Sequence, residues 1–176
     1  AEAGSTVKVT SDIDGLVATT TLDELTSAWS VETTALGEGI HFLTATATDG
    51  ANNTSVASSA LTVTIDTTPP AVPSDPDLAA LSDLGDSNND NLTSDTTPTI
   101  TGTAATGSIV TLVSTATGYV SETLVDGTTV WTITTSNPLT DGVHSLTVTA
   151  TDIAGNNSTD SGAIAITVDS LPPVAP

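Results

Sequence analysis

Aspartates are concentrated in one short stretch of the chain. Residues 82–98, SDLGDSNNDNLTSDTTP, place Asp83, Asp86, Asp90 and Asp95 among Asn, Ser, Thr and Gly, with no basic residue. Hard cations such as Ca²⁺ bind roughly six to eight oxygens from carboxylates, carbonyls and water. The stretch is not an EF-hand loop, because the ligand spacing and the closing Glu are missing. Its chemistry predicts a calcium site, and the alternative is an acidic segment that is merely solvated.

Further aspartates precede this stretch. Pro69 and Pro70 cannot continue a central strand, so Asp66 is expected at the end of a domain, beside an acidic linker. Carboxylates from the domain end and the linker would then share an ion and stiffen the hinge, with the loop residues Asp49 and Asp152 nearby. The candidate metal ligands are Asp66, Asp77, Asp83, Asp90 and Asp95, followed by Asp75 and Asp86.

The overall charge restricts the possible partners. The chain of 176 residues carries 21 acidic residues and one basic residue, Lys8, for a net charge of −20. Such a chain repels itself unless cations neutralise it. Nucleic acids and anionic membranes need basic patches and are therefore excluded as partners. No apolar stretch reaches the ~20 residues that span a bilayer, so no membrane insertion is expected. Without Cys, neither a disulfide nor a thiolate metal site is available.

The residues that position these side chains follow a strand pattern. Segments such as HSLTVTATD (144–152) and AIAITVD (163–169) alternate apolar with small or polar residues. Val, Ile, Leu and Thr dominate them and suit a pleated surface. No segment has the period of an amphipathic helix of useful length. The chain is therefore predicted to be folded and all-β.

An internal repeat sets the domain organisation. GEGIHFLTATATD (37–49) matches TDGVHSLTVTATD (140–152), an offset of 103 positions from residue 37 to residue 140. LTVTIDTTPPAVP (61–73) matches IAITVDSLPPVAP (164–176) at the same offset. A period of about 100 residues built from short strands predicts tandem immunoglobulin-like β-sandwiches. The expected domains are a first module at 1–73, an acidic calcium-binding linker at 74–95 and a second module at 96–176.

The alternation of apolar residues has the same phase in both repeats, and this predicts which residues face the core. In the second module the inward residues are Val110, Leu112, Trp131, Ile133, Leu146, Val148, Ala150, Ile164, Ile166 and Val168. In the first module they are Val7, Val9, Trp29, Val31, Leu43, Ala45, Ala47, Leu61, Val63 and Ile65.

One strand predicted for the second repeat has no counterpart in the first. The second module opens with DTTPTITGTA (95–104), whereas the first begins at the equivalent of Ala104. We therefore interpret the chain as a window from a longer tandem array. Its first module is expected to have an unpaired sheet edge. The linker of a preceding repeat, or a strand donated by an adjacent molecule, would fill that edge.

The order of motifs resembles a known family. DTTPTITGTA, GSIVTLV, a Trp, LTDGVHSLTVTATDIAGNNS and ITVDSLPPVAP are similar to the bacterial Ig-like repeats of very large secreted adhesins of the type I secretion, RTX-type class. The resemblance covers essentially the whole chain. It implies a secreted, cell-surface stalk of repeats, stiffened by Ca²⁺, that serves cell adhesion or biofilm formation. The partners it implies are neighbouring Ig-like repeats of the same chain.

The sequence leaves two alternatives to this stalk. A ligand- or carbohydrate-binding adhesin module would need exposed aromatic residues, and the chain has two Trp, one Tyr and one Phe. An accessory domain of an extracellular enzyme is the other alternative. His41 and His144 occupy the same place in both repeats, which favours local packing and hydrogen bonding over catalysis. No GxSxG motif is present. The chain is thus not expected to be an enzyme.

Overall fold

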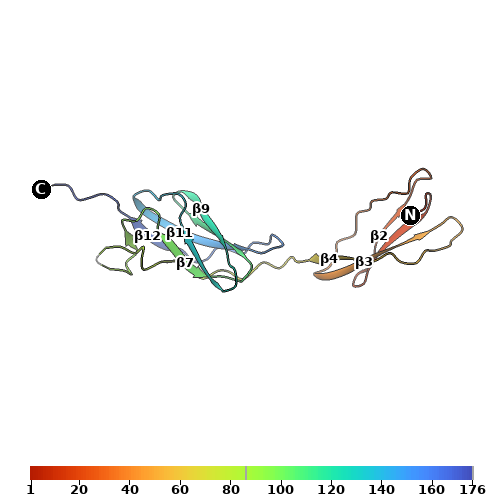
Figure 1. Ribbon diagram of the computed structural model, residues 1–176, viewed down its shortest axis with the longest axis horizontal. Helices are drawn as coiled ribbons and strands as arrows, with labels where there is room; N and C mark the ends of the chain where they lie inside the picture. The colour runs from red at the N-terminus through yellow and green to blue at the C-terminus, as the bar shows by residue number, and fades with distance from the viewer. Residues whose placement is uncertain (86, 176) are drawn as a thin grey trace. The chain divides into compact units, whose positions relative to one another are not determined.

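The chain forms two compact units, Ala1–Thr67 (unit 1) and Thr68–Pro176 (unit 2). The computed structural model describes residues 1–85 and 87–175. Within these ranges the regular elements are all strands (Figure 1), which confirms the all-β prediction. Across the same ranges there is no helix suited to crossing a membrane. Segment 74–95, expected to be a linker, lies within unit 2.

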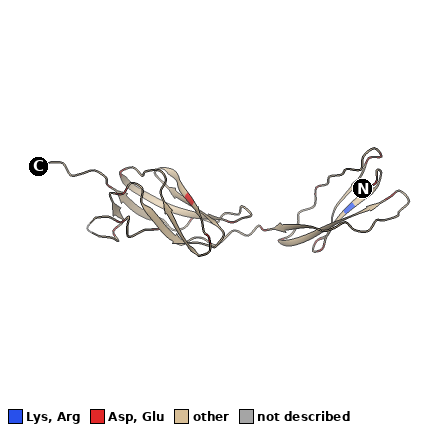
Figure 2. Cartoon of the chain, viewed as in Figure 1, with Lys and Arg blue, Asp and Glu red and all other residues tan. Residues whose placement is uncertain are grey.

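The negative charge is carried almost entirely by loops. Among the described acidic residues, only Asp77 and Glu122 belong to strands. The single basic residue, Lys8, lies in the first strand (Figure 2). The strand faces carry mainly Thr, Ser and aliphatic side chains instead, so the acidic side chains, which repel one another, lie mostly in loops.

Unit 2 contains two sheets. The five-stranded sheet has the order β6-β12-β11-β8-β9 and the three-stranded sheet the order β10-β7-β5. The first comprises β6 (Leu92–Thr93), β8 (Ile109–Ser114), β9 (Gly118–Leu124), β11 (Gly142–Thr151) and β12 (Ile164–Val168). The second comprises β5 (Asp77–Leu78), β7 (Thr99–Thr103) and β10 (Val130–Thr134). All pairings are antiparallel except that of β6 with β12.

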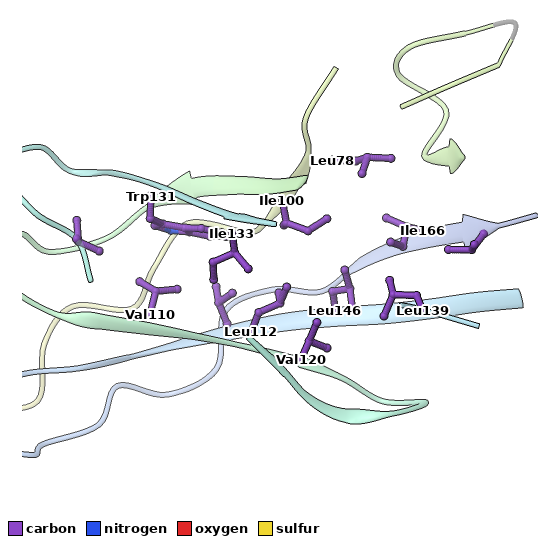
Figure 3. Close-up of a cluster of buried hydrophobic side chains, with 13 residues drawn as sticks. Leu78, Ile100, Val110, Leu112, Val120, Trp131, Ile133, Leu139, Leu146 and Ile166 are labelled. Carbon is purple, nitrogen blue, oxygen red and sulfur yellow. The ribbon is translucent and has the colours of Figure 1, made fainter. Parts of the chain in front are cut away.

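The core of unit 2 fills the space between these sheets (Figure 3). Trp131, Ile100 and Ile133 project from one sheet toward Val110, Leu112 and Leu146 of the other. Nine of the ten residues predicted to face inward are buried, and Ile164 is partly buried against the same cluster. The prediction for this unit is therefore confirmed. The core also contains residues that the alternation did not indicate: Leu78, Ile100, Val120, Val125 and Leu139.

A glycine in β7 allows the tryptophan to pack. Trp131 is 2% exposed and lies opposite Gly102 in the β10–β7 register. A Cβ atom at residue 102 would lie 2.5 Å from Cζ2 and 2.8 Å from Cε2 of the indole. The ring therefore rests directly on the backbone of β7, and any side chain at residue 102 would displace it.

Unit 1 has one sheet among its described residues. β1 (Thr6–Ser11), β2 (Gly15–Thr21), β3 (Gly39–Thr48) and β4 (Leu61–Ile65) pair in the order β2-β1-β3-β4. They correspond to β8, β9, β11 and β12 of unit 2. Residues 28–37, which include the counterpart of β10, form no strand. The second layer of the sandwich is thus not formed from residues 1–67.

The core prediction for unit 1 is confirmed only in part. Val7 and Val9 are buried, and most of the remaining predicted residues are partly buried: Val31, Leu43, Ala45, Ala47, Val63 and Ile65. Trp29 and Leu61 are exposed, so the prediction that they are core residues was wrong. Their side chains lie on the side of the unit 1 sheet that corresponds to the inner, covered side in unit 2. The described residues of unit 1 form no second sheet to cover them.

Candidate metal centre

The acidic stretch is anchored to the sheet of unit 2 by a short parallel pairing. β6 pairs with the end of β12, with Leu92 opposite Thr167 and Thr93 opposite Val168. The amide of Thr167 donates to Asn91 O (2.8 Å), and the amide of Asp169 donates to Thr93 O (2.9 Å). Asn91 adopts a φ of 60°, a conformation that Asn tolerates better than most residues. The acidic stretch is therefore held against the last strand of its own unit.

A polar network holds the two ends of this loop together. The hydroxyl of Thr93 donates to Ser82 O (2.6 Å), and the hydroxyl of Ser82 donates to Asp95 Oδ2 (3.2 Å). The other oxygen of Asp95 accepts from the amide of Thr97 (2.8 Å), and Ser82 Oγ accepts from the amide of Thr99 (2.9 Å). Both carboxylate oxygens of Asp95 thus accept hydrogen bonds that set the turn into β7.

Asp83 is the most buried of the predicted carboxylate ligands that the structure describes. It is 4% exposed, and its Oδ1 is buried with no hydrogen-bond partner among the described residues. Its Oδ2 accepts one long hydrogen bond, from the amide of Asn91 (3.4 Å). Burying an anionic oxygen without a partner costs several kcal/mol unless a cation or donor compensates it. A hard cation such as Ca²⁺ would provide this compensation, and the role of Asp83 as its ligand stays a prediction.

The structure adds a carboxylate that the sequence analysis did not select. Asp169 follows β12 and lines a cavity of about 200 Å³ together with Leu84, Gly85, Leu92, Thr93 and Ser94. At the repeat offset it is the counterpart of Asp66, in IAITVDSLPPVAP against LTVTIDTTPPAVP. The repeat itself was therefore the signal that could have identified it.

The remaining predicted ligands have different surroundings. Asp66 is half-buried in unit 1, whereas the other candidates belong to unit 2. The Asp75 carboxylate packs closely against the backbone of Gly162, since a Cβ atom added to that glycine would overlap with Asp75 Oδ1. Asp77 is exposed in β5. Asp90 is exposed and accepts from the amide of Leu92 (3.2 Å).

Asp86 lies outside the described residues. Within residues 1–85 and 87–175, no three acidic or histidine side chains are grouped to hold a metal ion. A cation at Asp83 would accordingly need carbonyl, hydroxyl, amide or water oxygens to complete its shell.

The two histidines share a pair of hydrogen bonds, one to a serine and one to a backbone carbonyl, in each unit. His41 Nε2 donates to Gly37 O (2.8 Å), and its Nδ1 forms a hydrogen bond with Ser11 Oγ (2.8 Å) and lies 3.5 Å from Asp14 Oδ2. His144 repeats the two hydrogen bonds with Thr140 O (2.8 Å) and Ser114 Oγ (3.1 Å). A carbonyl only accepts, so Nε2 carries a proton in both rings. Both rings are buried, and the prediction of local hydrogen bonding is confirmed.

The loop aspartates Asp49 and Asp152 organise their own turns. Asp152 Oδ1 accepts from the amides of Ala154 and Asn156 (both 2.9 Å), and Oδ2 accepts from Asn156 Nδ2 (2.9 Å). Asp49 makes the equivalent contacts with Ala51 and Asn53. Hydrogen bonds from the Asn side chains are the main cause that lowers the pKa of each aspartate below its ordinary value.

Replacing Asn156 with alanine should raise the pKa of Asp152 toward its ordinary value. A pKa lowered on folding stabilises the protein above the ordinary pKa, and this contribution is lost as pH falls through the folded-state pKa. The variant should therefore be less stable than the parent at neutral pH, with the difference vanishing in strong acid. An NMR titration of the Asp152 carboxyl would measure the shift. Asn53→Ala is the matched control, which should move Asp49 alone; an unchanged Asp152 titration in Asn156→Ala would contradict the prediction.

Comparison with known proteins identifies the fold family. Among the solved structures that resemble the chain are the fibronectin(III)-like modules of Clostridium thermocellum CbhA, at 17% identity and a TM-score of 0.53, covering 95% of this chain and 79% of that one. The BSP domain of a biofilm associated protein matches at 21% identity and a TM-score of 0.40, over 97% of this chain and 26% of that one. A Ca²⁺-stabilized adhesin of an Antarctic bacterium matches at 23% identity and a TM-score of 0.47, over 96% of this chain and 41% of that one.

The chain thus spans less than half the length of either adhesion-related relative. No curated protein matches it. The sequence profile of the bacterial Ig-like domain matches residues 1–67 and again residues 69–170, one match for each unit. This chain belongs to the bacterial Ig-like domain family and contains two matches to it.

Proposed function

We propose that the chain is a pair of extender repeats from the stalk of a secreted, cell-surface bacterial adhesin that supports cell adhesion or biofilm formation. The observation that carries the proposal is the duplication of internal structure. The buried His–Ser pair and the Asp–Asn turn recur at the same offset in both units. Stalks are built by repeating one structural unit, whose stability then depends on each repeat and its neighbours.

The same contacts argue against an enzymatic role. Both histidines are buried, and each is held by a serine hydroxyl and a backbone carbonyl. A general base must reach the substrate proton that it removes, and these rings are engaged on both nitrogens. Catalysis would therefore require groups other than these His–Ser pairs.

Calcium is proposed to stiffen the exit of each repeat. Asp83 would supply the buried carboxylate oxygen, and Asp169, just after β12, lines a cavity together with Leu84, the residue that follows Asp83. The counterpart of Asp169 in unit 1 is Asp66, immediately before the connection to unit 2. An ion bound here would tie the acidic loop to the segment leading to the next repeat. The partners of each repeat are then its neighbours in the same chain.

The test uses the chain extended after Pro176 by a second copy of residues 74–176. This extension continues the repeat and provides a junction that follows a complete acidic loop. Small-angle scattering should give a larger mean maximum dimension in Ca²⁺ than in chelator, because bending is restricted. Asp83→Asn should remove this response. Identical scattering in Ca²⁺ and chelator would overturn the proposed calcium joint.

A further inference from the structure

Unit 1 exposes a groove where unit 2 has its core. The groove has a volume of about 340 Å³ and is lined by Val9, Trp29, Val31, Leu43 and Leu61 with several Ser, Thr and Ala residues. In unit 2 the corresponding Leu112, Trp131, Ile133 and Leu146 are all buried, and Ile164 is partly buried. Exposure of Trp29 is 40%, against 2% for Trp131. Contiguous apolar surface of this kind marks a site of interaction.

The structure of unit 2 shows what covers this surface. β7 pairs with β10 along its length, with Trp131 opposite Gly102 and Ile133 opposite Ile100. The hydroxyl of Thr101 donates to Trp131 O (2.9 Å), and β5 pairs with the outer side of β7. Ile100 and Leu78 contribute buried side chains to the core. One segment, residues 74–103, therefore supplies both the strand and the apolar side chains that cover the tryptophan.

We infer that the groove of unit 1 binds an extended peptide segment of the same kind as residues 74–103, running directly into Ala1. Thr103 leads into Ala104, the repeat counterpart of Ala1. Such a segment would pair antiparallel with residues 28–31, its glycine facing Trp29 and its isoleucine facing Val31. Addition of a strand satisfies backbone groups and buries alternate side chains in one step.

A second copy of the chain is a poor donor of this segment. In unit 2, Leu78 and Ile100 are buried in the core of their own unit, and Thr103 and Ala79 are held by backbone hydrogen bonds to Ser74 (2.8 Å) and Thr99 (2.9 Å). Donating residues 74–103 to another molecule would open that core. A segment joined to Ala1 has no such cost, and its high effective concentration favours pairing.

The test joins a copy of residues 74–103 to the front of Ala1 in the full chain. Two tryptophans are present, and Trp131 is already buried. In the unextended chain acrylamide should therefore quench Trp29 selectively, and in the extended chain it should quench neither. Amides of residues 28–31 should exchange at least about tenfold more slowly once they pair. Amides of β11 serve as the internal standard for a folded chain.

A matched extension carries Ile100→Asp and Gly102→Val in the copied segment only. It should leave Trp29 open to the quencher, because it offers neither the apolar anchor nor room for the indole ring. Equal protection by both extensions would overturn the inference, as would an extended chain with protected β11 amides and a quenchable Trp29. Concentration-dependent protection of Trp29 in the unextended chain would assign the groove to a second copy and also overturn it.

Discussion

Trp131→Ala should lower the free energy of unfolding of unit 2 by about 3–5 kcal/mol, the usual cost of truncating a large buried aromatic residue. The same substitution at Trp29 should cost unit 1 about 1 kcal/mol or less, as is usual for exposed positions. The two residues occupy matching places in the repeat but are 2% and 40% exposed. Comparing the two substitutions therefore separates the stabilisation that comes from the second sheet from the effect of replacing a tryptophan.

Amide exchange followed during denaturation would measure both losses, with β11 reporting unit 2 and β3 reporting unit 1. The loss at Trp131 comes from an empty space against Gly102, Ile100 and Ile133 that the rigid sheets cannot close. The described residues 1–67 form no second sheet opposite Trp29, so little packing within unit 1 is lost. Equal destabilisation of the two units would contradict this account of the groove.

Asp83→Asn should stabilise unit 2 in the absence of calcium and should abolish the stabilisation that calcium gives the parent. In chelator the parent buries a carboxylate oxygen that has no partner among the described residues, and removing the charge should stabilise unit 2 by about 1–3 kcal/mol. In Ca²⁺ at a hundred times the Kd, the parent should gain about 2.7 kcal/mol, and the variant should gain nothing. For a domain of this size the parent's gain corresponds to a rise in Tm of roughly 10–20 °C.

Differential scanning calorimetry in calcium and in chelator would show both effects. Asp126→Asn is the matched control, because Asp126 is an exposed aspartate in a loop of the same unit. It should leave the calcium response unchanged and alter Tm little. A calcium-induced rise in Tm that is equal in Asp83→Asn and the parent would exclude Asp83 as a ligand.

Alternation and the internal repeat predicted the all-β fold and the inward residues of unit 2 from the sequence alone. Alternation assigns each side chain to one face of a strand, and this local property predicted Leu146, Val148 and Ile166 correctly. The repeat showed that His41 and His144 have structural roles, since one contact pattern serves both units. It also revealed that the counterpart of β7 is missing from unit 1.

Which strand faces are covered and which carboxylate is buried became clear only from the three-dimensional structure. Alternation identifies the inner face of Trp29 and Leu61, but it does not say whether a second sheet lies opposite, and none forms in unit 1. The pairing of β6 with β12 joins two-residue segments far apart in the sequence, too short to leave a periodic signal. That pairing brings Asp169 beside the acidic loop, in which Asp83 is buried and Asp90 exposed. Two aspartates of the same loop thus differ in burial. Burial depends on long-range contacts, which cannot be read from residue type and spacing.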